Sequence, residues 1–282
     1  MTTTLLEEIT AKPFLTISVE HRSDLAEKYL GVFVTPAEIE RNKNDWKVIS
    51  KNHSKLIMLD NICVGAVIRD IAKKEVADYY GYKLKLTVEM HPKLNRGQVH
   101  HADSGKLVGH GTHADRTKSS TTMNYVYKDK HLDPEEQKIY DEVGDSFGKW
   151  LYKNAYNYLR WTTNSYEEFK KKVSLSDDKL IGAVFCAENY EAVGHRDNDR
   201  SEWAVGYCYD TVPIEKGYFI YPEYGVAIEM TSNSLWCWKT QAVHGTARLD
   251  LNGGTRYTSA ITLTEKTAKA IEAEFKKQKE QK

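Results

Sequence analysis

Trp203-Ala-Val-Gly-Tyr-Cys-Tyr209 and Leu235-Trp-Cys-Trp-Lys-Thr240 are typical of the short segments that follow Leu180. They are rich in aromatic and β-branched residues, which favour pleated strands. Turn signals such as Asp250-Leu-Asn-Gly-Gly254 separate them. The segments span 181–186, 203–209, 217–221, 225–230, 235–240 and 256–263. Short strands at this spacing predict a jelly-roll or cupin-like barrel, a double-stranded β-helix, over residues 180–264.

Upstream of Leu180 the apolar residues recur at helical spacing. Thr35-Pro-Ala-Glu38 and Asp133-Pro-Glu-Glu136 are capping-box signals with proline at the first helical position. They predict helices over 35–51 and 133–160, and Ser165 begins a shorter helix that runs to Val173. We therefore expect an α+β protein with one domain over 1–282. Residues 1–179 are mainly helical support and loops, and 265–282 form a charged surface helix.

The segment from Val88 to Met123 is rich in His, Gly and Lys and is predicted to be a loop that borders a site. It contains five basic or imidazole side chains that would face a substrate: Lys106, His110, His113, Arg116 and Lys118. It also contains two His-x-Asp pairs, His101/Asp103 and His113/Asp115. No strand series with a later His and Arg follows either pair, so we expect loop residues or substrate contacts here, not metal ligands.

The bulk composition excludes some classes of protein. Forty Lys plus Arg balance forty Asp plus Glu, so the chain lacks the excess of positive charge typical of many nucleic-acid binders. No apolar run approaches the roughly 20 residues that span a bilayer, and no signal-peptide pattern opens the chain. The cysteines, Cys63, Cys186, Cys208 and Cys237, have no CxxC spacing and are expected to be free core thiols. We expect a protein of the cytoplasm or nucleus with no membrane association.

His195-Arg-Asp197 has the context that the other His-x-Asp pairs lack. It lies between two predicted strands, and residues two apart on a strand end point to one face. His244 follows 47 residues after Asp197, just beyond the strand 235–240. Two histidines and one carboxylate form the facial triad that suits Fe(II) and leaves positions open for O₂ and a co-substrate. We predict that His195, Asp197 and His244 are metal ligands and the catalytic centre.

Arg256 begins the last predicted strand, twelve residues after His244. Its planar guanidinium suits a bidentate contact with a carboxylate. Thr258 lies two residues along the same strand face and offers a hydroxyl. Together with the triad, this pattern predicts a non-haem Fe(II) dioxygenase that uses 2-oxoglutarate, with Arg256 and Thr258 holding the co-substrate.

The stretch from Ile181 to Thr264 resembles the fungal branch of the TET/JBP-like 2-oxoglutarate oxygenases. The pieces that carry the resemblance are Val184-Phe-Cys-Ala-Glu-Asn189, His195-Arg-Asp197, Trp203-Ala-Val-Gly206, Gly217-Tyr-Phe-Ile-Tyr-Pro-Glu-Tyr-Gly225, His244 and Arg256-Tyr-Thr-Ser259. The resemblance implies that His195, Asp197 and His244 bind iron, that Arg256 clamps 2-oxoglutarate and that Asn189 faces the same pocket. This chain departs from the family pattern at two places. It has Arg256-Tyr-Thr258 where Arg-x-Ser is usual, and Lys216-Gly217 where two glycines are common.

The resemblance also implies a substrate. Members with known activity oxidise 5-methylpyrimidines in nucleic acid, with the target base flipped into the pocket. One of Trp203, Trp236 and Trp238 would then stack on the base, although a barrel-core role is the other interpretation of these residues. The neutral composition favours the same chemistry on a protein side chain or a small metabolite. A catalytically silent cupin-like binding module is the third alternative.

Overall fold

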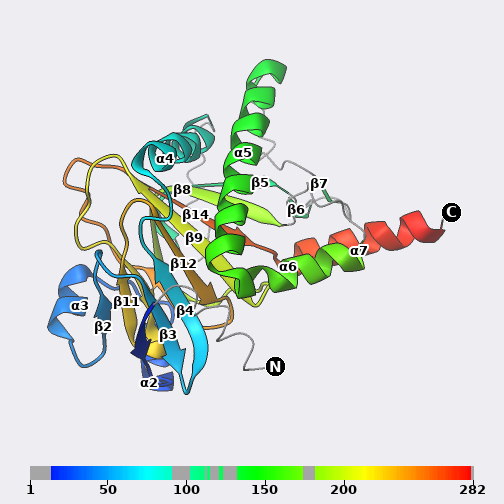
Figure 1. Ribbon diagram of the computed structural model, residues 1–282. Helices are drawn as coiled ribbons and strands as arrows, with labels where there is room; N and C mark the ends of the chain where they lie inside the picture. The colour runs from blue at the N-terminus through cyan, green and yellow to red at the C-terminus, as the bar shows by residue number, and fades with distance from the viewer. Residues whose placement is uncertain are drawn as a thin grey trace.

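The structure is a computed structural model that describes residues 14–90, 102–111, 113–114, 121–122, 132–173 and 182–280. The described parts form a mixed α+β protein around one large, strongly curled sheet (Figure 1). The helices are α2 (Ser23–Tyr29), α3 (Pro36–Arg41), α4 (Lys74–Glu89), α5 (Pro134–Tyr158), α6 (Arg160–Lys172) and α7 (Glu265–Glu280), with a 3₁₀ turn η1 (Pro222–Tyr224).

The strands of the large sheet come from both halves of the chain. They are β1 (Leu15–Ser18), β2 (Lys47–Ile49), β3 (Lys55–Leu59), β4 (Ile62–Ile68), β5 (Ala102–Gly111), β8 (Ala183–His195), β9 (Trp203–Asp210), β10 (Tyr218–Tyr221), β11 (Val226–Glu229), β12 (Ser234–Lys239), β13 (His244–Thr246) and β14 (Arg256–Thr262). The order is β1-β3-β4-β12-β9-β14-β8-β13-β10-β11-β2, and β5 pairs with β8 off this path. A separate small pair joins β6 (His113–Ala114) and β7 (Thr121–Thr122).

Aromatic contacts show that the sheet folds back on itself. Phe219 of β10 packs against Trp236 and Trp238 of β12, with ring centroids 5.9 and 4.9 Å apart. Strands β9, β14, β8 and β13 lie between β12 and β10 in the hydrogen-bonding order. A flat sheet would hold these rings several strand spacings of about 4.8 Å apart. The two arms therefore face each other across an aromatic interior.

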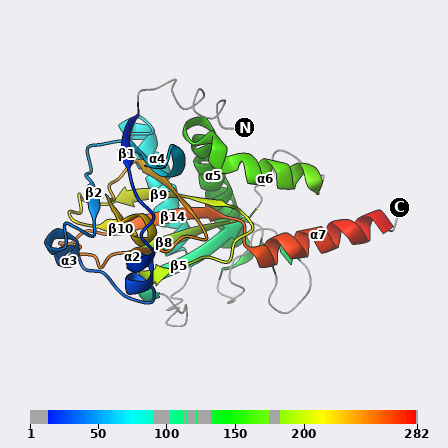
Figure 2. The ribbon, with the colours of Figure 1, turned by 90° about the horizontal axis from the view of Figure 1, so that it is seen from below.

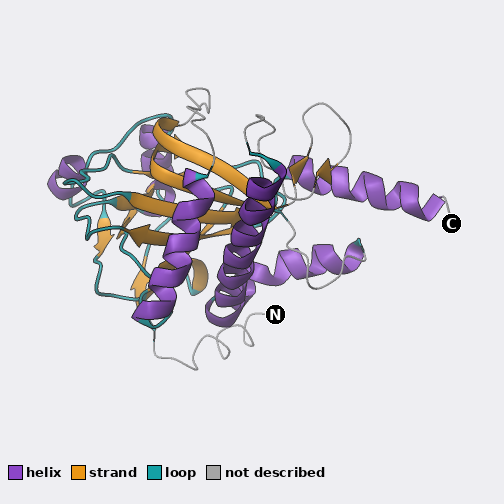
Figure 3. Cartoon of the chain, turned by 90° about the horizontal axis from the view of Figure 1, so that it is seen from above, coloured by secondary structure: helices purple, strands orange, loops and turns teal. Residues whose placement is uncertain are grey.

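Helices cover the outer face of this curl. Leu84 of α4 and Phe147 and Leu151 of α5 are fully buried against strand residues such as Val205 and Tyr207 of β9. Figures 1 and 3 show α4 and α5 lying across the strands, and Figure 2 shows α7 extending away from them. No helix among the described residues is long and apolar enough to cross a membrane.

Both predicted capping boxes are confirmed. Thr35 and Glu38 exchange hydrogen bonds at the start of α3, and Asp133 and Glu136 do so at the start of α5. The predicted helix over 35–51 is wrong beyond Arg41, however. Asn42 leaves the helical region of backbone conformation, and residues 47–49 form β2 beside β11. Asn and Asp side chains compete for backbone hydrogen bonds, so the stretch Asn42 to Asp45 ends the helix.

The prediction that residues 1–179 are mainly helices and loops is also wrong in part. Strands β1 to β4 extend the same sheet that the C-terminal third builds, and residues 102–111, predicted to be loop, form β5 along β8. A local signal for one hairpin was present. Asp60 and Asn61 join β3 to β4 with positive φ angles of 47° and 67°, which is the backbone of a two-residue type I′ turn.

Candidate metal centre and its pocket

Two adjacent strands bring the predicted histidines together. His195 ends β8 and His244 begins β13, and the two residues are direct partners in the antiparallel register. Their rings have centroids 4.5 Å apart. His244 is 3% exposed and packs against Phe219 and Trp238, which fix its ring from the interior of the curled sheet. Residues 49 apart in the sequence thus share one end of the curled sheet.

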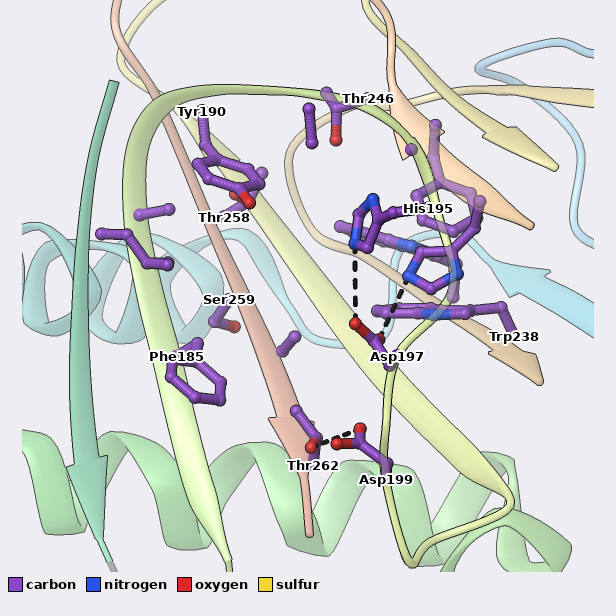
Figure 4. Close-up of a pocket in the computed structure, with 18 of the residues that line it drawn as sticks. Phe185, Tyr190, His195, Asp197, Asp199, Trp238, Thr246, Thr258, Ser259 and Thr262 are labelled. Atoms are coloured by element: carbon purple, nitrogen blue, oxygen red, sulfur yellow. Dashed lines mark hydrogen bonds and ion pairs between the residues drawn. The ribbon is translucent and has the colours of Figure 1, made fainter. Parts of the chain in front are cut away.

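Asp197 follows β8 and faces both imidazoles. Its backbone N–H donates to the carbonyl of Thr240 at 2.9 Å, and its carbonyl accepts from the Gln241 side chain at 3.0 Å. Its Oδ1 lies 3.5 Å from His195 Nε2, and its Oδ2 lies 3.2 Å from His244 Nε2. One ligand atom from each of the three residues lies within 4.8 Å of the others. Figure 4 shows the Asp197 carboxylate pointing toward the His195 ring.

The hydrogen bonds of the two rings define which nitrogen of each ring carries the hydrogen in the neutral form. His195 Nδ1 lies 2.8 Å from the carbonyl oxygen of Val193, and His244 Nδ1 lies 2.9 Å from that of Ala242. A carbonyl can only accept, so each Nδ1 carries a hydrogen. In the neutral imidazoles each Nε2 then presents a lone pair toward Asp197. With both rings neutral, lone pairs of all three side chains face one another, and a cation bound between them would remove the repulsion.

Without a bound cation, protonation is the other way to satisfy the cluster, because a protonated imidazole donates from Nε2 to Asp197. Burial would raise the pKa of Asp197, but hydrogen bonds and charge from His195 and His244 outweigh it and hold that pKa far below its usual range. Burial acts against the charged form of His195, yet contact with Asp197 raises its pKa. The next carboxyl, Asp199, behaves in the opposite way. Burial, followed by the negative charge of Asp197, raises its pKa to about 7.

The cluster opens into a cavity of about 380 Å³ inside the curled sheet. The cavity has a mainly apolar and aromatic wall with a few hydroxyl and carboxyl groups. It is lined by Leu107, Phe185, Ala187, Tyr190, Ala192, His195, Asp197, Asn198, Asp199, Phe219, Trp236, Trp238, His244, Gly245, Thr246, Thr258, Ser259, Ala260, Thr262 and Thr264. Figure 4 shows Phe185 and Tyr190 on the side away from Asp197. No lysine or arginine is among the described residues of this wall.

Arg256 is not one of the lining residues. Its side chain is 1% exposed and is bound to Asp210, with Nε 2.7 Å from Oδ1 and Nη2 3.0 Å from Oδ2. Nη2 also donates to the carbonyl of Met230 at 3.0 Å. Only Nη1 has no hydrogen-bond partner among the described residues. The predicted bidentate fork is therefore already occupied by a carboxylate of the protein itself.

Thr258 and Asn189 are placed differently from each other. Thr258 lines the cavity, whereas Arg256, two residues before it on β14, does not. Asn189 lies outside the lining set, and its Oδ1 accepts from the backbone N–H of Arg256 at 2.9 Å. It has a positive φ of 49° within β8. Asn189 thus fixes the start of β14 in this structure and does not face the pocket.

The predicted substrate-facing segment is largely a strand. His110 is 2% exposed and packs edge-on against Tyr140 of α5, so it is not the surface contact that we predicted. Leu107 of β5 does line the cavity, and Lys106 is partly exposed. Arg116 and Lys118 lie outside the described residues, as do His101 and Asp115. No second metal-ligating cluster occurs among the described residues.

Sequence reasoning missed three lining residues that matter for a ligand: Phe185, Tyr190 and Asp199. A signal existed for two of them. Phe185 and Ala187 alternate with the outward-facing Val184 and Cys186, so strand periodicity places Phe185 inside. Asp199 continues the two-residue spacing of His195 and Asp197. The tryptophan prediction is refined in the same way, because Trp236 and Trp238 line the cavity and Trp203 belongs to the outer core.

Comparison with known proteins supports the fold. No protein-family profile and no curated protein sequence matches the chain. Among solved structures, one described as NgTET1 in complex with 5mC DNA aligns with a TM-score of 0.56 and 10% identity, covering 95% of this chain and 92% of that one. A Pseudomonas putida prolyl-4-hydroxylase aligns with a TM-score of 0.42 and 8% identity, covering 72% and 93%. The chain therefore shares the fold of NgTET1.

Proposed function

We propose that this protein is an Fe(II)- and 2-oxoglutarate-dependent dioxygenase built on a double-stranded β-helix. The observation that carries the proposal is the convergence of two Nε2 atoms and the Asp197 carboxylate on the wall of one pocket. Two imidazoles and one carboxylate on one face of an ion are the donor set of non-haem Fe(II) oxygenases. The NgTET1-like fold and the TET/JBP-like sequence pattern support the same conclusion.

The residues divide into three roles in this proposal. His195, Asp197 and His244 hold Fe(II), and iron with O₂ and 2-oxoglutarate supplies the oxidising chemistry when bound. The aromatic wall excludes water and orients the group to be oxidised. Thr258 offers a hydroxyl to the co-substrate from the cavity wall.

Arg256 fits a carboxylate only through Nη1. That atom is buried and without a hydrogen-bond partner among the described residues. It lies over Gly217, where a Cβ atom would come within 1.9 Å of it. Asp210 already binds the Nε–Nη2 edge of the guanidinium. Arg256 would therefore give 2-oxoglutarate a single hydrogen bond, from an Nη1 whose position the Asp210 pair fixes. That Arg256 binds the co-substrate stays a prediction, now with one hydrogen bond from Nη1 in place of the bidentate contact.

For the substrate, we extend the proposal to a 5-methylpyrimidine in nucleic acid. Trp236 and Trp238 stand nearly parallel, with centroids 6.3 Å apart and planes at 20°, and both line the cavity. Flat aromatic surfaces of this kind hold a flipped base. The structural neighbour NgTET1 was seen with 5mC DNA.

A specific observation favours a second substrate class. The described cavity wall contains no lysine or arginine, and the whole chain has no net charge. A small metabolite or a protein side chain would need no cationic groove, whereas a nucleic-acid backbone binds mainly through cations.

One experiment separates these possibilities. Protein with Fe(II), ascorbate and 2-oxoglutarate is incubated with 5-methylcytosine and thymine oligonucleotides, and nucleosides and succinate are measured by mass spectrometry. Hydroxymethyl, formyl or carboxyl products support the nucleic-acid substrate. Succinate without those products favours the metabolite or protein hydroxylase. No Fe(II) binding and no succinate would contradict the dioxygenase and leave the silent binding module.

A further inference from the structure

Glu223 lies outside the pocket yet contacts both chain segments that carry the three candidate ligands. It belongs to η1, the short turn after β10, and its side chain is 14% exposed. Its Oε2 accepts from the backbone N–H of Val243 at 3.0 Å. The same oxygen lies 3.0 Å from Nη2 and 3.2 Å from Nη1 of Arg196. Val243 immediately precedes His244, and Arg196 stands between His195 and Asp197.

The chain that enters α2 also holds Glu223 in place. Oε1 of Glu223 lies 3.2 Å from Nε2 of His21, and the Glu223 carbonyl accepts from the backbone N–H of Arg22 at 2.8 Å. Both partners belong to the chain entering α2, which packs against η1. Gly225, at the end of η1, has a left-handed φ of 59°, and a Cβ there would lie 2.9 Å from the carbonyl of Asp45. The turn that carries Glu223 is thus held on several sides.

We infer that Glu223 is a positioning residue that fixes the distance between the His195–Asp197 segment and His244, and so tunes affinity for the bound metal. This inference rests on the proposed function, because it presumes that the three residues bind an ion. The physical reason is that a metal site demands ligand atoms held within tenths of an ångström. Partners that orient ligand segments typically change metal affinity by about 10- to 100-fold when removed.

Two of the three candidate ligands, Asp197 and His244, are not held within a long strand. Asp197 lies beyond the end of β8, and β13 is only three residues long. Direct ties between the segments exist, such as the bond from Asp197 N–H to the Thr240 carbonyl. They fix Asp197 to the turn after β12. Glu223 adds a charged tie, because its Oε2 binds both the Arg196 side chain and the Val243 N–H. Its charge-assisted bonds are about twice as strong as neutral ones.

The chain offers a matched control in Glu191 of β8. Its Oε1 accepts from the backbone N–H of Leu249 at 2.7 Å, and its Oε2 lies 3.8 Å from Nη1 of Arg248. The side-chain exposures of Glu191 and Arg248, 11% and 46%, are close to the 14% and 42% of Glu223 and Arg196. Neither Leu249 nor Arg248 adjoins a candidate ligand. Removing Glu191 therefore also breaks one bond from a backbone N–H and one arginine ion pair, but at residues that do not adjoin a candidate ligand.

The test is an anaerobic titration of the full chain with Co(II), followed through the visible absorption of the bound ion. Glu223→Ala is expected to raise the Kd by about 10- to 100-fold, and Glu223→Gln by less, because its amide oxygen still accepts from Val243. Glu191→Ala should change the Kd by less than about threefold. The Gln variant keeps the shape of the side chain and serves if the Ala variant does not fold.

The outcomes are distinguishable. Equal Kd values for wild type, Glu223→Gln and Glu223→Ala would overturn the inference while leaving the metal site intact. Equal losses in the Glu223 and Glu191 variants would also overturn it, because the effect would then be one of general stability. If wild type binds no Co(II), and His195→Ala changes nothing, the proposed function itself fails.

Discussion

Two carboxylates in the curled sheet, Asp197 and Asp210, have opposite surroundings. Asp210 pairs across the β9–β14 ladder with Arg256, and the guanidinium saturates it with two parallel bonds. Asp197 faces two imidazoles whose Nδ1 hydrogens are already bound to carbonyls. The side chain of Asp210 is 2% exposed and that of Asp197 is 27% exposed.

The difference separates a structural charge pair from a ligand site. An arginine supplies fixed hydrogens, so the Asp210 cluster is neutralised within the protein. Neutral imidazoles supply lone pairs, so the Asp197 cluster gathers negative potential at the edge of a cavity. Two carboxylates in one sheet thus belong to a locked charge pair and to a candidate metal centre, according to which nitrogens face them.

The largest expected effect tests the Asp197 cluster. Asp197→Ala and His244→Ala should each weaken Co(II) or Fe(II) binding by more than about 100-fold, because the loss of a partner outside the ligand set alone costs about 10- to 100-fold. Anaerobic titration measures this. Asp210→Asn should leave metal affinity within a few-fold of wild type. If Asp210→Asn weakened binding as much as Asp197→Ala, the two clusters would not be functionally separate.

The second effect tests the Asp210 cluster through stability. Asp210→Asn leaves the buried guanidinium without its counter-charge, and breaking a buried pair costs about 3–5 kcal/mol. Urea unfolding monitored by tryptophan fluorescence should show this loss in the free energy of unfolding. The double variant Asp210→Leu/Arg256→Met should recover most of it, because apolar replacements carry no buried charge. A loss below about 1 kcal/mol in the single variant would contradict the locked-pair description.

Arg256 links the two clusters if it also binds the co-substrate. Arg256→Lys removes the fork and should raise the 2-oxoglutarate concentration needed for half-maximal succinate formation, because an ammonium cannot hold Asp210 and a second carboxylate together in the same geometry. Kinetics at fixed Fe(II) measure the change. An unaltered requirement in a folded variant would assign Arg256 to structure alone.

The buried His110 extends the comparison to a group whose contribution to the free energy of unfolding depends on pH. It belongs to β5 and packs against α5, its Nδ1 has no hydrogen-bond partner among the described residues, and burial lowers its pKa to about 4. The fold therefore favours neutral His110. Its contribution to stability is complete above the unfolded pKa of about 6.5 and is lost as pH falls toward 4, by roughly 3 kcal/mol at about 1.4 kcal/mol per unit.

His110→Gln removes this titration. Unfolding free energies of wild type and variant should converge between pH 7 and pH 4, with wild type losing more. Parallel pH profiles would show that His110 does not titrate as its burial requires. Subtracting the two curves also removes the opposing contribution of Asp199, whose raised pKa adds stability at low pH.

The smallest expected effect concerns Thr258. Thr258→Val keeps the shape of the side chain but removes the hydroxyl from the cavity wall. One neutral hydrogen bond is worth about 0.5–1.5 kcal/mol, so affinity for 2-oxoglutarate should fall by about 2- to 10-fold. The free energy of unfolding should change by less than about 1 kcal/mol. Unchanged co-substrate affinity would mean that 2-oxoglutarate binds away from Thr258.

The sequence by itself determined features that depend on local chemistry. Capping boxes at Thr35 and Asp133 act within one helical turn. Alternating residues in β9, β12 and β14 define two faces without reference to the rest of the chain. The spacing of His195 and Asp197, with His244 after a strand, also sufficed to predict which three residues converge.

Only the tertiary structure decided which side chains meet across the sheet. Arg256 has Asp210 as its partner because β14 pairs with β9 in that register, and a one-residue shift would have removed the pair. Strands β1 to β5 pair with strand edges of the sheet, where unpaired backbone N–H and C=O groups offer hydrogen bonds to segments with weak helical patterns. Glu223 reaches both ligand segments for the same reason, since contacts between distant segments depend on packing and pairing that no local pattern contains.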